Sequence, residues 1–333
     1  MRLALALVPL LACAQPAWVP QKSGTSAGLR GLSVRNSREA WASGTGGTYL
    51  HTIDGGATWA AAQVPGAESL DFRDIEAFGA GTVMLLSSGS GEKSRIFRTD
   101  DGGAHWTLRY TNPDAAGFFD AFAFWNGRRG IALGDPVKGR LAILVTADGE
   151  RWSPQPGPEA LPGEGAFAAS GTCLIVTGEQ DAWFGTSGAR AFHSTDGGRT
   201  WTAVQTPVRH DGPGAGIFSL AFSDARHGVA VGGDYTRPES AEHNIAITSD
   251  GGRTWVEPAG TPPAGFRSAV AYVAARKAWI AVGSSGSDVS YDGGQSWKPF
   301  DTAPYNSVAF APDGSGWAVG PKGGVARLEW RGR

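Results

Sequence analysis

A short motif of the form Ser-Thr-Asp-Gly-Gly-Arg-Thr-Trp recurs along this chain, and it constrains the fold more than any other feature. The complete form spans residues 194–201, and a shortened copy ends at Trp152. Four further close copies end at Trp59, Trp106, Trp255 and Trp297. The motif aspartates are Asp54, Asp101, Asp148, Asp196, Asp250 and Asp292. The steps between them are 47, 47, 48, 54 and 42 residues. Such a period is typical of a repeated supersecondary unit, and four short strands per unit would make a β-propeller blade.

The chemistry of the motif is that of a tight hairpin. Asp and Ser/Thr side chains accept hydrogen bonds from backbone amides of their own turn, and the glycine pair supplies the positive φ values that the turn needs. The tryptophan buries a large ring beside the turn. We therefore predict a structural role for all six motif aspartates.

The composition agrees with an all-β protein and gives no sign of a nucleic-acid partner. The 333 residues include 50 Gly and 20 Pro, and 18% of them are charged. A net charge of −2 provides no basic surface for nucleic acid. Because the repeat extends from near Trp18 to Trp330 without a break, we expect one domain over residues 15–333.

The repeats predict seven blades. Each contains an alternating first strand, such as residues 218–222, then a second strand, a third strand, the Asp hairpin and a fourth strand. The first strands are expected to begin near Leu29, Phe72, Phe118, Gly163, Ile217, Phe266 and Tyr305. Six or eight blades are the alternatives. The last repeat ends at residues 328–330 without an Asp hairpin, and residues 18–21 resemble an outer strand, so we predict that the N-terminus closes the last blade and removes two open sheet edges.

The N-terminus resembles an export signal. Met1 and Arg2 precede the apolar run 3–12, which is too short to span a bilayer. We expect residues 1–14 to be a signal peptide and the protein to be extracytoplasmic, either periplasmic or secreted. Residues 12–14 fit a cleavage site, whereas residues 10–13 resemble a lipobox that would attach the protein to a membrane through lipidated Cys13. Cys173 lies in an apolar run and is expected to be buried, without an internal disulfide.

Strand order predicts where function lies. If the Asp hairpins join strands three and four at one rim, the loops after the second strands and the starts of the first strands share the opposite rim. The starts of the first strands differ between blades and carry Arg30, Arg73, Phe119, Glu164, Phe218, Arg267 and Asn306. When the residues at a repeated position differ from blade to blade, a role in recognition is favoured over a role in packing.

The predicted ligand-binding residues of this rim are Arg30, Arg73, Asp120, Asp135, Glu164, Asp234, Tyr235 and Arg267. Three arginines could hold a carboxylate, a phosphate or an acidic peptide. In the alternative interpretation they pair with Asp74, Asp120, Asp135 and Asp234 and only close the pore entrance.

The Asp hairpins are those of the bacterial neuraminidase repeat, which sialidases share with unrelated propellers. A fuller resemblance covers residues 29–325 and rests on residues 29–32, 71–74, 118–122, 134–136, 165–170, 231–235 and 266–270. These segments resemble bacterial secreted propellers related to the photosystem II stability/assembly factor family. The resemblance implies a seven-bladed extracytoplasmic scaffold, and in photosynthetic members a chaperone whose arginine patch binds an assembling membrane protein. Relatives are often labelled oxidoreductases, a label that no residue here supports.

Enzyme interpretations find less support. A sialidase needs an arginine triad and a Tyr nucleophile with a Glu partner; Tyr235 has no evident Glu, and the Arg-Ile-Pro signature is absent. Another glycosidase would need two facing carboxylates. The candidates are Asp74, Asp120, Asp135, Glu164 and Asp234.

Residues 24–28, 44–47 and 89–94 resemble nucleophile-elbow or nucleotide loops but lack the required helix, so no cofactor is expected. The six histidines lack ligand spacing, so no metal is expected.

The sequence thus predicts a non-catalytic binding or assembly scaffold with a protein or glycan ligand in the envelope. A monomer is expected. The alternative is a carbohydrate-active hydrolase that uses the acidic residues of the same rim.

Overall fold

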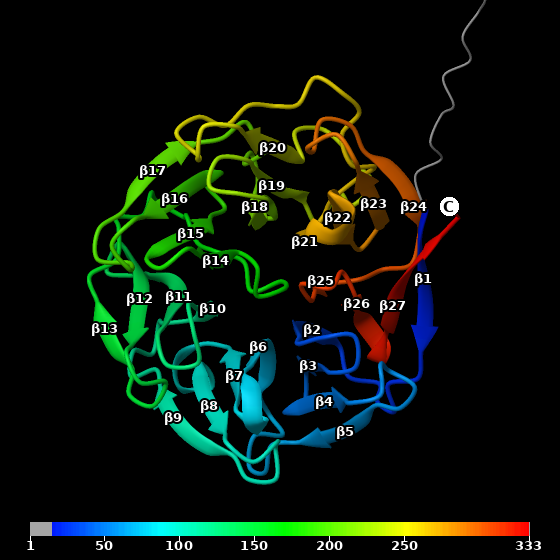
Figure 1. Ribbon diagram of the computed structural model, residues 1–333. Coiled ribbons are helices and arrows are strands. Elements are labelled where there is room, and N and C mark those ends of the chain that lie inside the picture. Colours follow the sequence, from blue (N-terminus) through cyan, green and yellow to red (C-terminus); the bar gives the residue numbers. More distant parts are fainter. Residues whose placement is uncertain (1–14, 333) are drawn as a thin grey trace, which may run out of the picture.

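The computed structural model describes residues 15–332 and shows seven antiparallel sheets arranged as blades around a common axis (Figure 1). Blade 1 contains β2 (Leu29–Val34), β3 (Ala40–Gly44), β4 (Thr48–Thr52) and β5 (Ala60–Gln63). Blade 2 contains β6 (Asp71–Ala77), β7 (Val83–Ser88), β8 (Arg95–Thr99) and β9 (Thr107–Thr111). Blade 3 contains β10 (Phe119–Phe124), β11 (Gly130–Val137), β12 (Arg140–Thr146) and β13 (Ser153–Gln155).

The remaining blades continue around the ring. Blade 4 contains β14 (Leu174–Thr177), β15 (Asp181–Gly185), β16 (Arg190–Ser194) and β17 (Thr202–Gln205). Blade 5 contains β18 (Ala215–Phe222), β19 (Gly228–Asp234) and β20 (Ile245–Thr248). Blade 6 contains β21 (Ala269–Val273), β22 (Ala278–Gly283), β23 (Gly286–Ser290) and β24 (Lys298–Asp301). Blade 7 contains β25 (Ser307–Phe310), β26 (Gly316–Val319), β27 (Val325–Arg331) and β1 (Gln15–Gln21).

Helical structure in the described part of the chain is limited to four single 3₁₀ turns. They are η1 (Gly79–Gly81), η2 (Gly91–Lys93), η3 (Ala274–Arg276) and η4 (Pro321–Gly323). Within residues 15–332 no helix has the length and apolar character that a membrane crossing requires. The seven-bladed, all-β prediction is confirmed.

The N-terminal strand closes the ring as predicted. β1 pairs antiparallel with β27, with Trp18 opposite Leu328. Gln21, at the end of β1, joins blade 7 to blade 1: its Oε1 accepts hydrogen bonds from the Nε1 atoms of Trp59 (2.9 Å) and Trp317 (3.0 Å). Its Nε2 donates to the carbonyl of Gly55 (3.2 Å). Residues 1–14, for which a signal peptide was predicted, lie outside the described part of the chain.

The six Asp hairpins lie on one rim and have the predicted geometry. In the complete copy, Ser194 Oγ accepts from the N–H of Gly198 (2.8 Å), and Asp196 Oδ1 accepts from the N–H of Thr200 (2.9 Å). Thr200 Oγ1 donates to the second oxygen of Asp196 (2.6 Å). Gly197 and Gly198 both have positive φ, as the turn requires. The pKa of Asp196 is lowered to about 2, first by the hydrogen bond from Thr200.

The hairpin tryptophans join neighbouring blades. Trp297, which is 2% exposed, packs in blade 6 against Val229 and Val231 of blade 5. Trp106 of blade 2 likewise meets Tyr49 of blade 1 edge-on at 5.1 Å between ring centroids. The core is therefore a ring of apolar layers between blades, and the hairpins hold its outer edge together.

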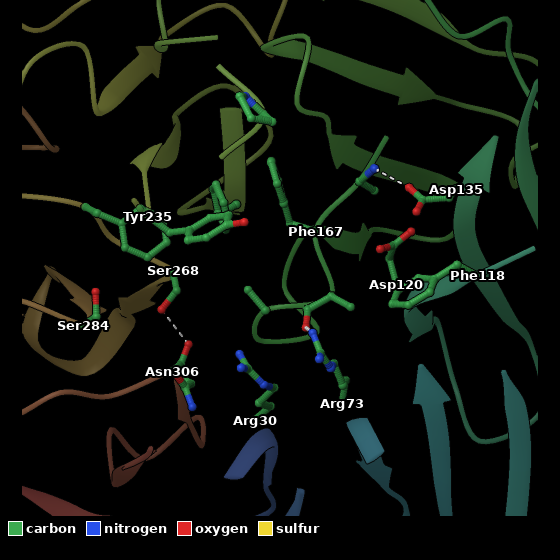
Figure 2. Close-up of a pocket in the computed structure, with 16 residues that line it drawn as sticks. Arg30, Arg73, Phe118, Asp120, Asp135, Phe167, Tyr235, Ser268, Ser284 and Asn306 are labelled. Carbon is green, nitrogen blue, oxygen red and sulfur yellow. Dashed lines mark hydrogen bonds between the residues drawn. The ribbon is translucent and has the colours of Figure 1, made fainter. Parts of the chain in front are cut away.

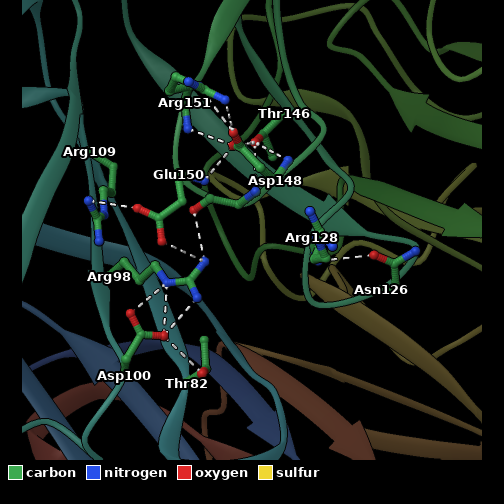
Figure 3. Close-up of polar contacts among 11 residues, drawn as sticks. Thr82, Arg98, Asp100, Arg109, Asn126, Arg128, Thr146, Asp148, Glu150 and Arg151 are labelled. Atoms are coloured by element: carbon green, nitrogen blue, oxygen red, sulfur yellow. Dashed lines mark hydrogen bonds and ion pairs between the residues drawn. The ribbon is translucent and has the colours of Figure 1, made fainter.

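The shortened hairpin of blade 3 gains ionic support from blade 2 (Figure 3). Arg98 of β8 pairs with Asp100 at 2.7 Å and donates to the carbonyl of Gly149 at 3.2 Å. Glu150, within the hairpin, binds Arg109 of β9 at 2.7 Å. Contacts between blades thus accompany the shortening of the turn.

Blade 5 lacks the predicted fourth strand. Val256 forms both backbone hydrogen bonds with Ile247 at 2.9 Å, but only as an isolated bridge. Two residues later Pro258 has no N–H to donate to β20, so the pairing ends.

Blade 4 departs from the prediction at its first strand, which begins at Leu174 and not near Gly163. Residues 163–173, here called the central loop, turn at Gly163 and Gly171, which both have positive φ. The loop runs inward to the axis (Figure 1). Ser170 Oγ donates to the Ser268 carbonyl (2.9 Å), and the Ser170 carbonyl accepts from Ser307 Oγ (3.2 Å). The central loop therefore bridges first strands on the far side of the ring.

Candidate functional site

A pocket of about 470 Å³ lies on the rim opposite the Asp hairpins, over the central loop (Figure 2). Six blades each contribute the residue immediately before the first continuously paired residue of their first strand. These six, here called the ring residues, are Arg30, Arg73, Asp120, Phe218, Ser268 and Asn306. Blade 4 contributes Ala166 to Ala169 of the central loop instead.

β-bulges set the side-chain direction of four of the ring residues. The strand register shifts at Arg30, Arg73, Asp120 and Phe218, so each side chain leaves the ladder of its blade. A bulge redirects a side chain without ending the strand, and bulges are frequent beside functional sites. The predicted rim therefore carries a pocket whose lining varies at one repeated backbone position.

The equivalent positions in blades 3 and 6 were each predicted one residue too early. Asp120, and not Phe119, matches Arg30 and Arg73, because the bulge of β10 falls at residue 120. Ser268, and not Arg267, holds the position in blade 6, because pairing with β22 begins at Ala269. A one-residue shift exchanges the core-facing and pocket-facing side chains.

Two arginines form one wall of the pocket (Figure 2). Arg73 is held in place, since its Nε pairs with Asp71 at 2.8 Å and its Nη1 donates to the Ala168 carbonyl at 3.0 Å. The Arg30 side chain has no hydrogen bond or ion pair with any part of residues 15–332. Burial lowers the pKa of Arg30, the charge of Arg73 lowers it further, and the charge of Asp71 opposes both. A partly desolvated guanidinium without a partner is a ready anion-binding group.

Two aspartates form another part of the lining. Asp120 is 1% exposed, and its Oδ2 has no hydrogen-bond partner in the described structure. Asp135 Oδ1 accepts from the N–H of Ala166 at 3.0 Å. Burial raises the pKa of Asp120 well above its usual range, the charge of Asp135 raises it further, and Arg73 opposes both. The pKa of Asp135 is also raised, mainly by burial.

Aromatic rings cover the side of blade 5. Phe167 of the central loop stacks on Phe218 with 3.7 Å between centroids. Phe266 meets Phe218 edge-on at 4.7 Å, and Tyr235 lies 6.2 Å from the same ring. Tyr235 remains 54% exposed at the pocket mouth. The pocket thus offers an apolar surface between its charged walls.

Three predicted ligand-binding residues are engaged within the protein instead of lining this pocket. Glu164 pairs with Arg190, and its pKa is lowered: burial raises it, but hydrogen bonds from Arg190 and Thr186 outweigh that effect. Asp234 pairs with Arg237 at 2.7 Å. Arg267 is buried against Asp288 at 2.5 Å.

The alternative interpretation predicted that the rim arginines pair with Asp74, Asp120, Asp135 and Asp234. Those ion pairs do not form. Arg73 binds Asp71 and Arg267 binds Asp288. Asp74 lies under Gly171 of the central loop and accepts from the N–H groups of Ile75 (2.8 Å) and Phe122 (2.9 Å). Its pKa is raised well above its usual range, first by burial.

Of the five carboxylates that were candidates for hydrolysis, only Asp120 and Asp135 line the pocket. Asp120 and Asp135 lie next to one another on one side of the pocket, with arginines along the adjoining wall (Figure 2). Glu164 and Asp234 are ion-paired, and Asp74 is covered. A glycosidase mechanism requires carboxylates on both sides of the scissile bond. Among residues 15–332, no three His, Cys, Asp or Glu side chains gather as a metal site would require.

Comparisons with known proteins agree with the fold. A BNR/Asp-box repeat is matched at residues 192–203. The chain carries this repeat. A solved structure described as YCF48 bound to D1 peptide is 17% identical with a TM-score of 0.66, and the match covers 98% of this chain and 100% of that one. YCF48 from Cyanidioschyzon merolae is 19% identical with a TM-score of 0.63, covering 95% and 99%.

The fold alone does not decide function. A chain in a crystal structure of the mitotic checkpoint complex has the same TM-score of 0.66 at 10% identity, with 100% of this chain and 97% of that one covered. No curated protein matches the sequence. The resemblance to the photosystem II assembly factor family is therefore confirmed at the level of the fold, and the function depends on the pocket.

Proposed function

We propose that this chain is a non-catalytic, extracytoplasmic binding scaffold that recognises a negatively charged segment of a protein partner through the central pocket. The observation that carries the proposal is Arg30, a partly buried guanidinium that lines the pocket without any hydrogen bond or ion pair within the described residues. Removing such a group from water without a partner is costly, and an incoming carboxylate would supply the missing hydrogen bonds.

Three other features support a protein ligand. Arg73 adds positive charge beside Arg30, while Asp71 Oδ2 and the Ala168 carbonyl keep its side chain in place. Tyr235 presents an exposed ring at the pocket mouth, and aromatic residues of this kind anchor protein interfaces. The similar YCF48 structure holds a D1 peptide. Export rests on the apolar run 3–12.

Partner capture from an envelope extract tests the proposal. The exported protein, its Arg30→Ala and Arg30→Lys variants, and a control Arg253→Ala are compared, because Arg253 is an exposed arginine of an Asp hairpin. Loss of a charge-assisted bidentate contact should reduce capture of the specific partner about tenfold or more. Arg30→Lys should retain part of it, and Arg253→Ala should match wild type. Equal capture by Arg30→Ala and wild type would overturn the proposal.

A further inference from the structure

The central pocket contains a guanidinium group and a carboxyl group that are both without a partner. Arg30 and Asp120 line the same cavity, yet neither side chain has a hydrogen bond or ion pair to any group in residues 15–332. Buried or half-buried charged groups are normally paired, because leaving them unpaired destabilises the fold. Here both ionisable groups lie unpaired within one pocket.

The order of the blades keeps the two charges apart. Arg30 belongs to blade 1 and Asp120 to blade 3, while Arg73 of blade 2 lies between them (Figure 2). Arg73 cannot turn fully toward Asp120, since Asp71 and the Ala168 carbonyl hold its guanidinium. Arg30 and Asp120 therefore lie on different blades, with Arg73 held between them.

The surroundings of Asp120 favour an incoming cation. Asp135 is close enough for its charge to affect Asp120, and a cation near both carboxyl groups would relieve their repulsion. Phe118 and Phe167 also line the cavity, and aromatic faces attract ammonium and guanidinium groups and their alkyl stems.

We propose that the central pocket is specific for a zwitterionic group, with an anion on Arg30 and an ammonium or guanidinium on Asp120 and Asp135. This inference rests on the proposed function, in which the ligand is a segment of a protein partner. Such a segment would present an acidic and a basic group together, with the carbon chain between them lying against Phe167. The pocket would reject segments that carry only one of the two charges, because the other wall would stay unpartnered.

Small probes test the charge pairing without knowledge of the partner. The series of ω-amino acids from β-alanine to 8-aminooctanoate is titrated into the exported protein, with binding followed by NMR shifts. Each is compared with the alkanoate and the alkylamine of equal length, so no spacing between the charges is assumed. At least one zwitterion should bind about tenfold more tightly than both of its single-charge counterparts.

Variants assign the two charges to their walls. Asp120→Asn should lower the affinity of the best zwitterion to that of its alkanoate and leave alkanoate binding unchanged. Asp135→Asn keeps an oxygen that can accept from the Ala166 N–H, and it should also lower the affinity of the zwitterion. Arg30→Ala should lower the affinity of the best zwitterion to that of the alkylamine of equal length. The matched control is Glu239→Gln, an exposed carboxylate on the same rim.

The outcomes separate this inference from the proposed function. If no zwitterion in the series exceeds its counterparts, or if Asp120→Asn leaves the advantage intact, the zwitterion inference is wrong while anion binding at Arg30 stands. If Arg30→Ala leaves alkanoate binding unchanged, the proposed function fails as well. Thermal unfolding of each variant confirms that it is folded.

Discussion

The two rims of this propeller use the same residue types in opposite ways. On the Asp-hairpin rim, each aspartate accepts hydrogen bonds from its own turn, and the pKa values of Asp54 and Asp250 are lowered to about 2. On the pocket rim, Asp120 is buried without a hydrogen bond and its pKa is raised. The difference teaches that the hairpin carboxylates, which are satisfied at repeated positions, build the ring, whereas Arg30 and Asp120, which are unsatisfied at a varied position, line the pocket that we propose for recognition.

The largest expected effect is on the hairpin side. Trp297→Ala should lower the free energy of unfolding by about 3–5 kcal/mol, because it opens a cavity between blades 5 and 6. Tyr235→Ala, which removes an exposed ring from the pocket rim, should cost about 1 kcal/mol or less. Urea unfolding measures both. Equal losses would break the distinction between the rims.

Removal of the closing contact should come next. Gln21→Ala leaves the indole N–H groups of Trp59 and Trp317 without their acceptor, and each unsatisfied donor costs about 1–3 kcal/mol. We expect a loss of about 2–4 kcal/mol in urea unfolding. Gln63→Ala removes a more exposed glutamine of blade 1 and should have a much smaller effect. A Gln21 loss no greater than that of Gln63 would show that this contact does not secure the ring.

The pH dependence of stability should have opposite signs on the two rims. The folded-state pKa of Asp120 is raised, so its contribution is present below the unfolded pKa of about 4 and is lost as pH rises through the folded value. The ionisable groups that interact with it electrostatically are Asp135, Arg73 and Cys173. Asp120→Asn should therefore flatten the decline in stability as pH rises above about 4.

Asp196 should behave in the opposite way. Its folded-state pKa is lowered to about 2, so its contribution is present above the unfolded pKa of about 4 and is lost as pH falls toward 2. Asp196→Asn should flatten that acid limb. Urea unfolding at several pH values distinguishes the two variants, and identical pH profiles would contradict the assignment of the rims.

The smallest expected effect concerns Arg30. Since its guanidinium has no partner to lose among residues 15–332, Arg30→Ala should leave the free energy of unfolding within about 0.5 kcal/mol of wild type, or raise it. Thermal or urea unfolding measures this. A loss greater than about 1 kcal/mol would identify Arg30 as a structural residue.

The repeat made the architecture predictable, but it did not predict which side chains point into the pocket. Local turn chemistry placed the hairpins, and their absence from the last repeat identified the closing strand at Trp18. The bulge of blade 3 and the start of pairing in blade 6 left no such signal, so Phe119 and Arg267 were placed at positions that belong to Asp120 and Ser268. The ion pair joins Arg267, in the segment before β21, to Asp288 of β23, and repeat alignment does not reveal such a contact.

The insertion in blade 4 was hidden for a different reason. The apolar residues of the central loop resemble a first strand, although positive φ at Gly163 and Gly171 turns the chain inward. A segment that packs at the axis is as apolar as a strand. The fourth strand of blade 5 was lost to Pro258, a signal that the sequence did contain.

The most direct test of the central claim compares two exposed apolar positions, one on each rim. A photo-crosslinking residue is introduced in cells in place of Tyr235, which is 54% exposed beside the pocket, or Ile53, which is 64% exposed in an Asp hairpin. The account predicts a discrete crosslinked partner from position 235 that disappears with Arg30→Ala, and no such product from position 53. A partner crosslinked from position 53 and not from position 235 would place the recognition surface on the Asp-hairpin rim and contradict it.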